Sequence, residues 1–340
     1  MNRKRFFVAA LTAVSIFSMP LATSAENSAT EKLIQIEEDT YGAEQVGAIL
    51  NRISKIEKDY SGKNMQGNMN ARIDAAYDNL YSNFGEPSII SKVNALEWNV
   101  NREVQSGGID KRLVSLENEI LGKAGAGNFS ARIRELSKAS FGGDNVPLVE
   151  VQVPANTAVK VSLIDSITSK TLQVGDVVKI KVAEDVIIGG KLVFAKGLQG
   201  VGKVASVRKA KGWMGKNGKV DIDFDELRTI DGRSIETFVG EEAKQKMIDE
   251  QMIEGASLVA MNLNDDWNKV LVRGKNIEIK QGTELYIQTK NNSSVYALST
   301  ENGSLRLSST LTTQEIHETK NSEPEEVVSD EDDFYLDDEE

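Results

Sequence analysis

The chain has 340 residues, a formal net charge of −12 at pH 7, no cysteine and one histidine, His317. The lack of cysteine excludes disulfides, thiolate metal sites and a lipid anchor built on cysteine. A lone histidine near the C-terminus excludes Ser–His and Cys–His nucleophile pairs and histidine-based zinc sites. Paired carboxylates could still support hydrolysis, but Asp and Glu are too abundant for any pair to stand out. We therefore expect a protein that is not an enzyme and that has no catalytic residues and no cofactor.

Residues 1–25 have the pattern of a secretory signal peptide. A basic cluster at residues 3–5 precedes an apolar run from Phe6 to Phe17, and small residues before Glu26 fit a cleavage site. The apolar run is too short for an ordinary transmembrane helix, and an uncleaved membrane anchor is the alternative. Export combined with the absence of cysteine indicates a bacterial envelope or periplasmic protein, or a secreted one.

A period of 20 residues runs through residues 32–142, and such a period is typical of stacked structural units. Within each unit the apolar residues are spaced by three and four, which places them on one face of a helix, in a single stripe, and glycines lie before and after each helix. We expect a short antiparallel helical repeat array over residues 30–142, with a homo-oligomer through the narrow stripe as an open alternative. The aliphatic column of the repeat consists of Leu33, Ile53, Ile73, Val93, Leu113 and Ile133.

Two charged columns accompany the aliphatic one. A basic residue precedes each aliphatic position, as at Arg52 and Arg112. In four repeats a glutamate lies five residues after the basic residue, at Glu37, Glu57, Glu97 and Glu117. This spacing does not form an ion pair within one helix, where residues three and four apart are neighbours. The columns therefore predict Arg–Glu contacts between adjacent helices. A basic ladder that reads a repeating anionic polymer is the alternative.

Beyond the glycine- and proline-containing breaker at residues 142–147, the pattern changes from helical to alternating. Many short runs of valine and isoleucine over residues 147–298 are separated by turn residues, which predicts an antiparallel β-sandwich or small barrel. A helical stretch from Glu241 to Glu254 interrupts them. The chain is thus predicted to be an α+β protein with several domains.

A glycine-rich hairpin loop in the β-region carries cations around a tryptophan. Such a loop suits an anionic or carbohydrate ligand through charge and stacking, and a solvated turn with the tryptophan folded back onto the sheet is the alternative. The candidate ligand-binding residues are Trp213, Arg208, Lys209, Lys211, Lys216 and Lys219. The next strand places Asp221, Asp223 and Asp225 on one face, where they could hold a divalent cation or pair with the loop lysines.

Residues 299–340 read as a polar linker followed by an acidic tail. Residues 321–340 contain eleven acidic and no basic residues, so nearly all of the net charge lies there. A block with so little apolar content is expected to be disordered. An apolar island of Phe334, Tyr335 and Leu336 resembles a docking motif for a partner. A solubilising tail and a cation-binding tail are the alternatives.

The repeat units from Arg52 to Glu57 and from Arg112 to Glu117 resemble the Arg-Leu-x-x-Leu-Glu repeats of exported bacterial envelope proteins. The segments 189–197 and 230–232 resemble a β-rich domain of exported bacterial proteins. The resemblance implies an envelope location and no activity, and it supplies no site residue.

These observations predict an exported, non-enzymatic scaffold or tether of the bacterial envelope, with the repeats making contacts to envelope proteins. A binding module for cell-wall glycan or another anionic envelope polymer, acting through the Trp213 loop, is the alternative. No nucleic acid partner and no transmembrane span are expected.

Overall fold

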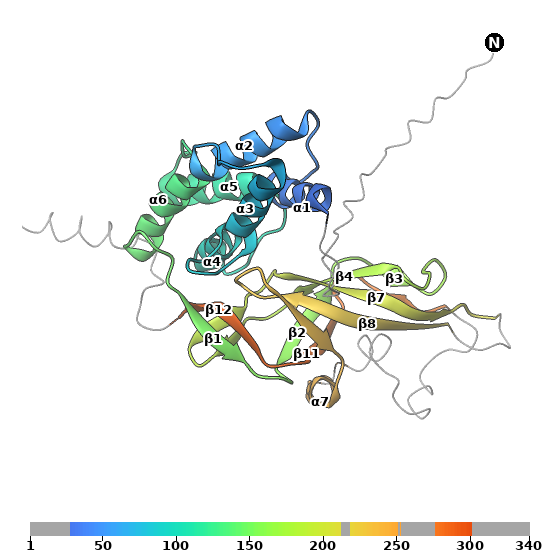
Figure 1. Cartoon of the computed structure of the whole chain (residues 1–340). Helices are drawn as coiled ribbons and strands as arrows, with labels where there is room; N and C mark the ends of the chain where they lie inside the picture. The colour runs from blue at the N-terminus through green and yellow to red at the C-terminus, as the bar shows by residue number, and fades with distance from the viewer. Residues whose placement is uncertain (1–27, 212–217, 251, 253–275, 301–340) are drawn as a thin grey trace, which may run out of the picture.

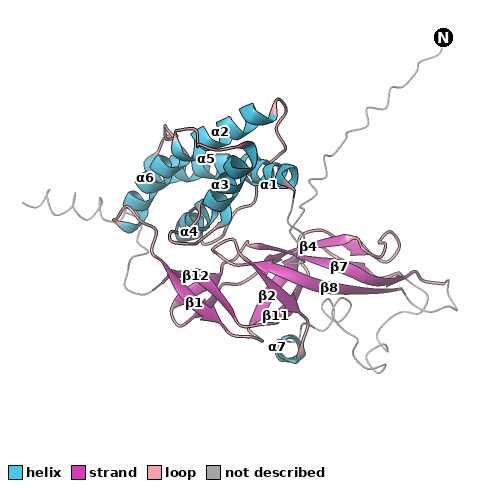
Figure 2. Cartoon of the chain, in the orientation of Figure 1, coloured by secondary structure: helices cyan, strands magenta, loops and turns pink. Residues whose placement is uncertain are grey.

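The computed structural model describes residues 28–211, 218–250, 252 and 276–300. In Figure 1 the blue-to-green helices of the N-terminal part lie on one side, and the strands, coloured from green to red, lie on the other. The predicted order of helical repeats followed by antiparallel sheets is confirmed. Figure 2 shows that helices and strands are segregated along the chain, apart from one short helix beside the sheets.

The six repeat helices each contain thirteen residues and begin 20 residues apart. Five of them end at a residue whose backbone is in the left-handed conformation. Glycine adopts this conformation easily, as at Gly42 with φ 84°. Arg102 takes the same position after the fourth helix with φ 55°, without the freedom of glycine. The helices are α1 (Ala29–Tyr41), α2 (Ile49–Ser61), α3 (Met69–Tyr81), α4 (Ile89–Asn101), α5 (Ile109–Leu121) and α6 (Phe129–Phe141).

The aliphatic column of the repeat faces inward on every helix. All six of its side chains, from Leu33 to Ile133, are at most 4% exposed. Helices that are not consecutive in the chain also pack together, namely α1 with α3 and α5, and α2 and α4 with α6. The array therefore closes on itself, and its own helices bury the stripe. A homo-oligomer would have to use another surface, because this stripe is not available to a second molecule.

The two charged columns meet between consecutive helices, as predicted. Each arginine pairs with the glutamate fifteen residues earlier, with nitrogen–oxygen distances of 2.5, 2.7, 2.7 and 2.6 Å along the chain. The pairs are Arg52–Glu37, Arg72–Glu57, Arg112–Glu97 and Arg132–Glu117. The four arginine side chains are only 8–14% exposed, so the alternative of a basic ladder for an anionic polymer is wrong for them.

Three of these glutamates also fix the connection between the helices. Glu37, Glu97 and Glu117 each accept a backbone N–H from the residue eight positions later. The carboxylate thus holds both the start of the next helix and the extended segment that leads to it. This double role explains how a connection of seven residues has the same shape in several repeats.

Acid is expected to weaken the helical array through the carboxylate of Glu117. Burial opposes ionisation of Glu117, but the hydrogen bonds from Arg132 and the Gly125 N–H, with the charge of Arg132, outweigh burial and lower its pKa below 4.5. A carboxyl whose pKa is lowered by folding stabilises the fold above its unfolded pKa, and this contribution disappears as pH falls through the folded pKa. Urea unfolding between about pH 6 and about pH 3 should show this loss.

The matched variant for the acid experiment is Glu117→Gln. It should be less stable than the parent near neutral pH and should lose less stability on acidification, because its amide does not titrate. Parallel curves for the two proteins would contradict a contribution of Glu117 to acid lability.

Three β-units follow the helices. Strands β11, β2, β4, β7, β8 and β9 form a closed barrel in that order, β1, β12, β6 and β5 form a four-stranded sheet, and β10 pairs with β3. The strands are β1 (Leu148–Val153), β2 (Ala158–Leu163), β3 (Ile167–Thr168), β4 (Val177–Val182), β5 (Val186–Ile188), β6 (Lys191–Phe194), β7 (Gln199–Arg208), β8 (Lys219–Arg228), β9 (Ser234–Phe238), β10 (Glu278–Ile279), β11 (Glu284–Thr289) and β12 (Ser293–Ser299).

The helical stretch predicted over Glu241–Glu254 is α7 (Glu241–Asp249), which ends earlier than predicted, at the C-cap Glu250, and packs on β11 and β2 of the barrel. Its buried residues are Ala243 and Met247, so its apolar side faces the core. Across the described part of the chain, no helix has the length and apolar character needed to cross a membrane.

Candidate functional site

The structure describes four of the six residues of the predicted loop site. These are Arg208, Lys209, Lys211 and Lys219, which lie where the long hairpin strands β7 and β8 end. Arg208 and Lys219 face each other in the strand register, and Lys209 and Lys211 are exposed. Trp213 and Lys216 lie outside the described residues, as do Phe334, Tyr335 and Leu336 of the tail.

A neighbouring segment holds the base of this hairpin. The Ala210 N–H donates to Asn276 Oδ1 at 2.9 Å, and the same oxygen lies 3.2 Å from the Ser169 hydroxyl. A side chain at Gly218 would meet Ser169 Oγ at 2.3 Å, so the hairpin backbone approaches β3 closely. The loop cations therefore project from a fixed base.

The aspartate face of β8 pairs with the loop in part. The Asp221 carboxylate lies 3.0 Å from Lys219 Nζ and accepts the Ser206 hydroxyl, while Asp223 is exposed. Among the described residues, no group of three or more His, Asp or Glu side chains is placed to hold a metal ion. Asp225 and the other two aspartates line an open depression of about 610 Å³, together with apolar residues, one threonine and two lysines: Ile222, Phe224, Thr237, Phe238, Val239, Lys244 and Lys290.

The most elaborate polar arrangement lies where α4 meets the β-domain, which consists of the strands from β1 to β12 (residues 148–299). At the start of α4, side-chain amide and hydroxyl groups donate to backbone carbonyls in the turn between β8 and β9. Asn83 Nδ2 and Ser91 Oγ reach the Asp231 carbonyl at 3.1 and 2.9 Å, and Asn94 Nδ2 reaches the Ile230 carbonyl at 3.0 Å. The three donors are buried, and burial strengthens such hydrogen bonds.

The other end of α4 is anchored through its tryptophan. Trp98 Nε1 donates to Asp185 Oδ2 at 2.9 Å, and the other oxygen of Asp185 accepts the Lys196 N–H at 2.7 Å. The chain after the helix continues the contact, because the Val104 N–H donates to the Lys196 carbonyl at 2.8 Å. Val104 itself is 5% exposed. We call this contact surface of α4 and residues 102–107 with the β-domain the α4 seam.

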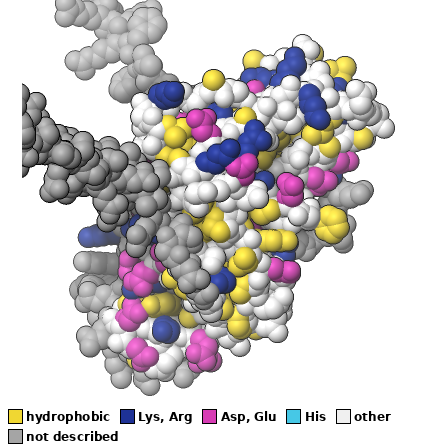
Figure 3. Space-filling model, turned by 90° about the vertical axis from the view of Figure 1, so that its left-hand side faces the viewer, with side chains coloured by type: hydrophobic (Ala, Val, Ile, Leu, Met, Phe, Trp, Pro, Cys, Tyr) yellow, Lys and Arg dark blue, Asp and Glu magenta, His cyan; other side chains and the backbone are white. Residues whose placement is uncertain are grey.

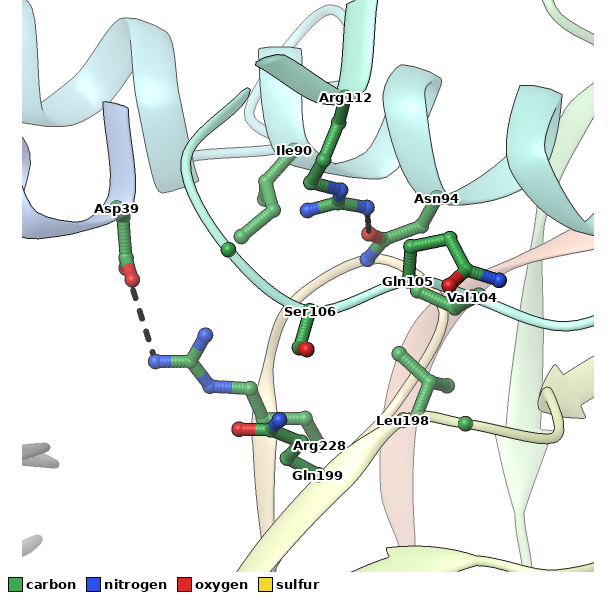
Figure 4. Close-up of a pocket in the computed structure, with 12 residues that line it drawn as sticks. Asp39, Ile90, Asn94, Val104, Gln105, Ser106, Arg112, Leu198, Gln199 and Arg228 are labelled. Carbon is green, nitrogen blue, oxygen red and sulfur yellow. Dashed lines mark hydrogen bonds and ion pairs between the residues drawn. The ribbon is translucent and has the colours of Figure 1, made fainter. Parts of the chain in front are cut away.

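A small cavity of about 50 Å³ lies in the α4 seam (Figure 4). On one side Asp39 accepts the Tyr81 hydroxyl at 2.6 Å and lies 3.7 Å from Arg228. On the other side Arg112 donates to Asn94 Oδ1 at 2.6 Å. This volume holds a few water molecules, whereas sites for small organic ligands are usually several hundred Å³. The cavity therefore fits hydration of the seam and not a substrate.

Sequence reasoning missed the α4 seam. The signal was present in Ile89–Asn101, which is apolar on more than one side and therefore predicts burial on more than one side. Ile90, Ala95 and Trp98 lie outside the repeated stripe, yet all are at most 5% exposed. In α2, α3, α5 and α6 none of the residues at the three corresponding positions is buried.

Replacing Trp98 by phenylalanine should weaken the α4 seam without unfolding the helices. The ring that remains still fills most of the site, but the hydrogen bond to Asp185 is lost and that carboxylate loses a donor. We expect a loss of about 1–2 kcal/mol in the free energy of unfolding and faster amide exchange in residues 102–107. Unchanged exchange there would show that the Trp98–Asp185 bond does not hold the seam.

Comparisons with known proteins add little to this description. No family model matches the chain, and no curated protein matches it. Among solved structures, the chain is similar to ComB10 of the Com Type IV secretion system of Helicobacter pylori, with 17% identity over 43% of this chain and 90% of that chain. The TM-score is 0.23, and at that value the likeness supports no statement about the function of this chain.

Proposed function

We propose that the protein is an exported, non-enzymatic scaffold or tether of the bacterial envelope. The observation that supports this proposal most directly is the α4 seam. It joins the helical array to the β-domain, and the buried apolar residues of both form one continuous core. A scaffold needs such a fixed relation between its parts, because a partner that contacts both parts then meets a surface of constant shape.

The use of the charged columns supports the same proposal. The buried arginines and glutamates of the repeats bond to one another, and three of the glutamates also bond to the backbone, which stabilises the architecture. On the face drawn in Figure 3, basic side chains gather over the upper part with acidic ones among them. A surface of mixed charge suits recognition of proteins better than recognition of a uniformly anionic polymer.

Capture from solubilised bacterial envelope fractions tests the proposal. The full chain should retain defined proteins in stoichiometric amounts. The matched control is an Ile90→Asp variant, which places a carboxylate in the α4 seam and leaves the stripe of the array in place. Helicity by circular dichroism checks that the array of the variant is folded. Retention of purified wall polymer with no defined protein would contradict the scaffold.

A second candidate function is binding of an anionic wall polymer, and the exposure of Lys209 and Lys211 on a fixed hairpin base favours it. The test is co-sedimentation with purified wall polymer. Lys209→Glu with Lys211→Glu should abolish binding, whereas the control Lys290→Glu, on another part of the barrel, should not. Equal binding by both variants would exclude the loop.

The acidic residues 321–340 are expected to compete with the polymer for this loop. A tethered segment acts at an effective concentration on the order of millimolar, and charge attraction is screened beyond about 8 Å at physiological salt. Deletion of residues 321–340 should therefore strengthen polymer binding at low salt and change it little at high salt. Binding that is unchanged at every salt concentration would contradict the competition, and Trp213→Ala would test whether the gain depends on the loop.

A further inference from the structure

Strand β1 has a paired neighbour on one side only. Within the described residues it pairs with β12 and with no other strand. The Ser299 N–H donates to the Pro147 carbonyl, whereas the N–H of Tyr296, which lies opposite Glu150, points away from β1 to Asp231. Hydrogen-bonded and non-hydrogen-bonded pairs alternate along an antiparallel ladder. The odd-numbered residues of β1 therefore bond to β12, and the even-numbered ones direct their backbone groups outward.

The outward edge of β1 offers two complete donor–acceptor positions, Glu150 and Gln152. No described residue accepts a bond from either N–H. The N–H of the third outward residue, Leu148, already donates to the Val146 carbonyl at 2.8 Å. An edge with open donors and acceptors is a template for another strand.

The strand has few of the features that usually protect an edge. Its sequence from Leu148 to Val153 contains no lysine and no proline, and its one charge is Glu150. The strand is rich in β-branched residues, and one of them, Val149, is 38% exposed. Pro147 and Pro154 flank the strand and restrict any pairing to the six residues between them.

We propose that this edge pairs with the β1 of a second copy of the chain, antiparallel and with Val151 on the two-fold axis. This pairing joins the two four-stranded sheets into one continuous sheet. It does not depend on the proposed scaffold function, and it uses a surface other than the enclosed stripe of the repeats.

The positions of the outward groups limit the possible registers. In the dimer each even-numbered residue of one β1 must lie opposite an even-numbered residue of the other, because only these residues direct their backbone groups outward. Three antiparallel pairings then use both Glu150 and Gln152, with the two-fold axis at residue 150, 151 or 152. Centring on 150 places two glutamates opposite each other, and like charges at such positions are destabilising. Centring on 152 faces Glu150 with Pro154, which has no N–H to donate. Centring on Val151 pairs Glu150 with Gln152 of the second copy twice, so that each pair exchanges both of its backbone bonds.

A single cysteine tests this register directly, because the chain has none of its own. In the proposed pairing the two Val151 residues form a non-hydrogen-bonded pair with Cα atoms about 4.5 Å apart, which lies within the range of about 4.4–6.8 Å for disulfides. The full chain with Val151→Cys should form a disulfide-linked dimer under mild oxidation, and a reductant should reverse it.

The matched control is Val149→Cys on the same strand face. In the proposed register Val149 lies opposite Val153 of the second copy, so two cysteines at 149 are more than 10 Å apart, with about 3.3 Å per residue along a strand. Most of the Val151→Cys protein should therefore cross-link and little of the Val149→Cys protein. Equal cross-linking of both would indicate random collision and would overturn the proposal.

Sedimentation equilibrium of the full chain gives a second, independent measurement. The parent should be a dimer that dissociates on dilution, and Gln152→Pro should be a monomer with an unchanged helical and strand content by circular dichroism. Proline removes only the outward N–H there and is tolerated on an edge strand. A monomeric parent overturns the proposal. So does stronger cross-linking of Val151→Cys after deletion of residues 301–340, because a segment of the same chain would then be the occupant of the edge.

Discussion

Replacing Arg112 by methionine is expected to lower the free energy of unfolding by about 3–5 kcal/mol, because it leaves a buried carboxylate without its partner. Glu97 is 1% exposed and receives two bonds from this guanidinium. Arg112 also donates to Asn94, whose amide holds the Ile230 carbonyl across the α4 seam. Urea unfolding monitored by circular dichroism measures the effect as a lower midpoint with an unchanged slope.

Two controls separate this effect from a general loss of charge. Lys138→Met breaks an ion pair with Asp144 in which both side chains are more than half exposed, so it should cost at most about 1 kcal/mol. Combining Arg112→Met with Glu97→Gln should recover part of the loss, since the buried charge is then removed. Equal effects of Arg112→Met and Lys138→Met would contradict a structural role for the buried pairs.

Placing aspartate at the aliphatic column should have a comparably large effect at any of its positions. Ile53, Ile73 and Leu113 are each at most 1% exposed, and burying a carboxylate without a partner costs several kcal/mol. Each of the three variants should lose most of the helical signal in circular dichroism. The matched control is Leu50→Asp in α2, where the side chain is 56% exposed, and it should keep that signal. Tolerance of the three column variants would show that these positions are not equivalent parts of one core.

The helical half of the fold could be predicted in detail because its contacts recur in the sequence. The aliphatic column identifies the buried face six times over, and a chance pattern is not repeated in this way. The Arg–Glu contacts were predictable for the same reason, since the spacing excluded the same helix and left only a neighbour. The predicted row of neighbouring helices did not foresee that α1 packs with α5 and α2 with α6. Such closure depends on the angle between successive units, which side-chain periodicity does not contain.

The β-half was predictable only as a class. Alternation identifies strands such as β4 and β8, but their neighbours in the barrel depend on contacts between distant segments. The α4 seam shows the same limit. The extra apolar face of α4 indicates a second buried side, but nothing near it in the sequence indicates that the turn at Ile230 and Asp231 covers that side. Of the candidate loop residues, Arg208 and Lys219 lie together as the hairpin pattern implies. Trp213 lies outside the described residues, so its role stays a prediction.

The pairing of β1 with β12 determines when the fold can be completed. Leu148 lies opposite Leu298, so β1 pairs with a strand about 150 residues further along the chain. During synthesis the intervening residues must all leave the ribosome before this pairing can form. The repeats have a shorter delay, because each Arg–Glu contact spans fifteen residues and the packing of α1 with α5 and of α2 with α6 spans about 80. Local contacts form faster than distant ones, since closing a long loop costs more entropy. During synthesis the helical array should therefore form early, while β1 stays exposed until the last described strand arrives. A chain that stops before Ser293 lacks β12, so β1 would follow the folded array with the backbone groups of both its edges unpaired. Truncated products of this protein are therefore expected to aggregate.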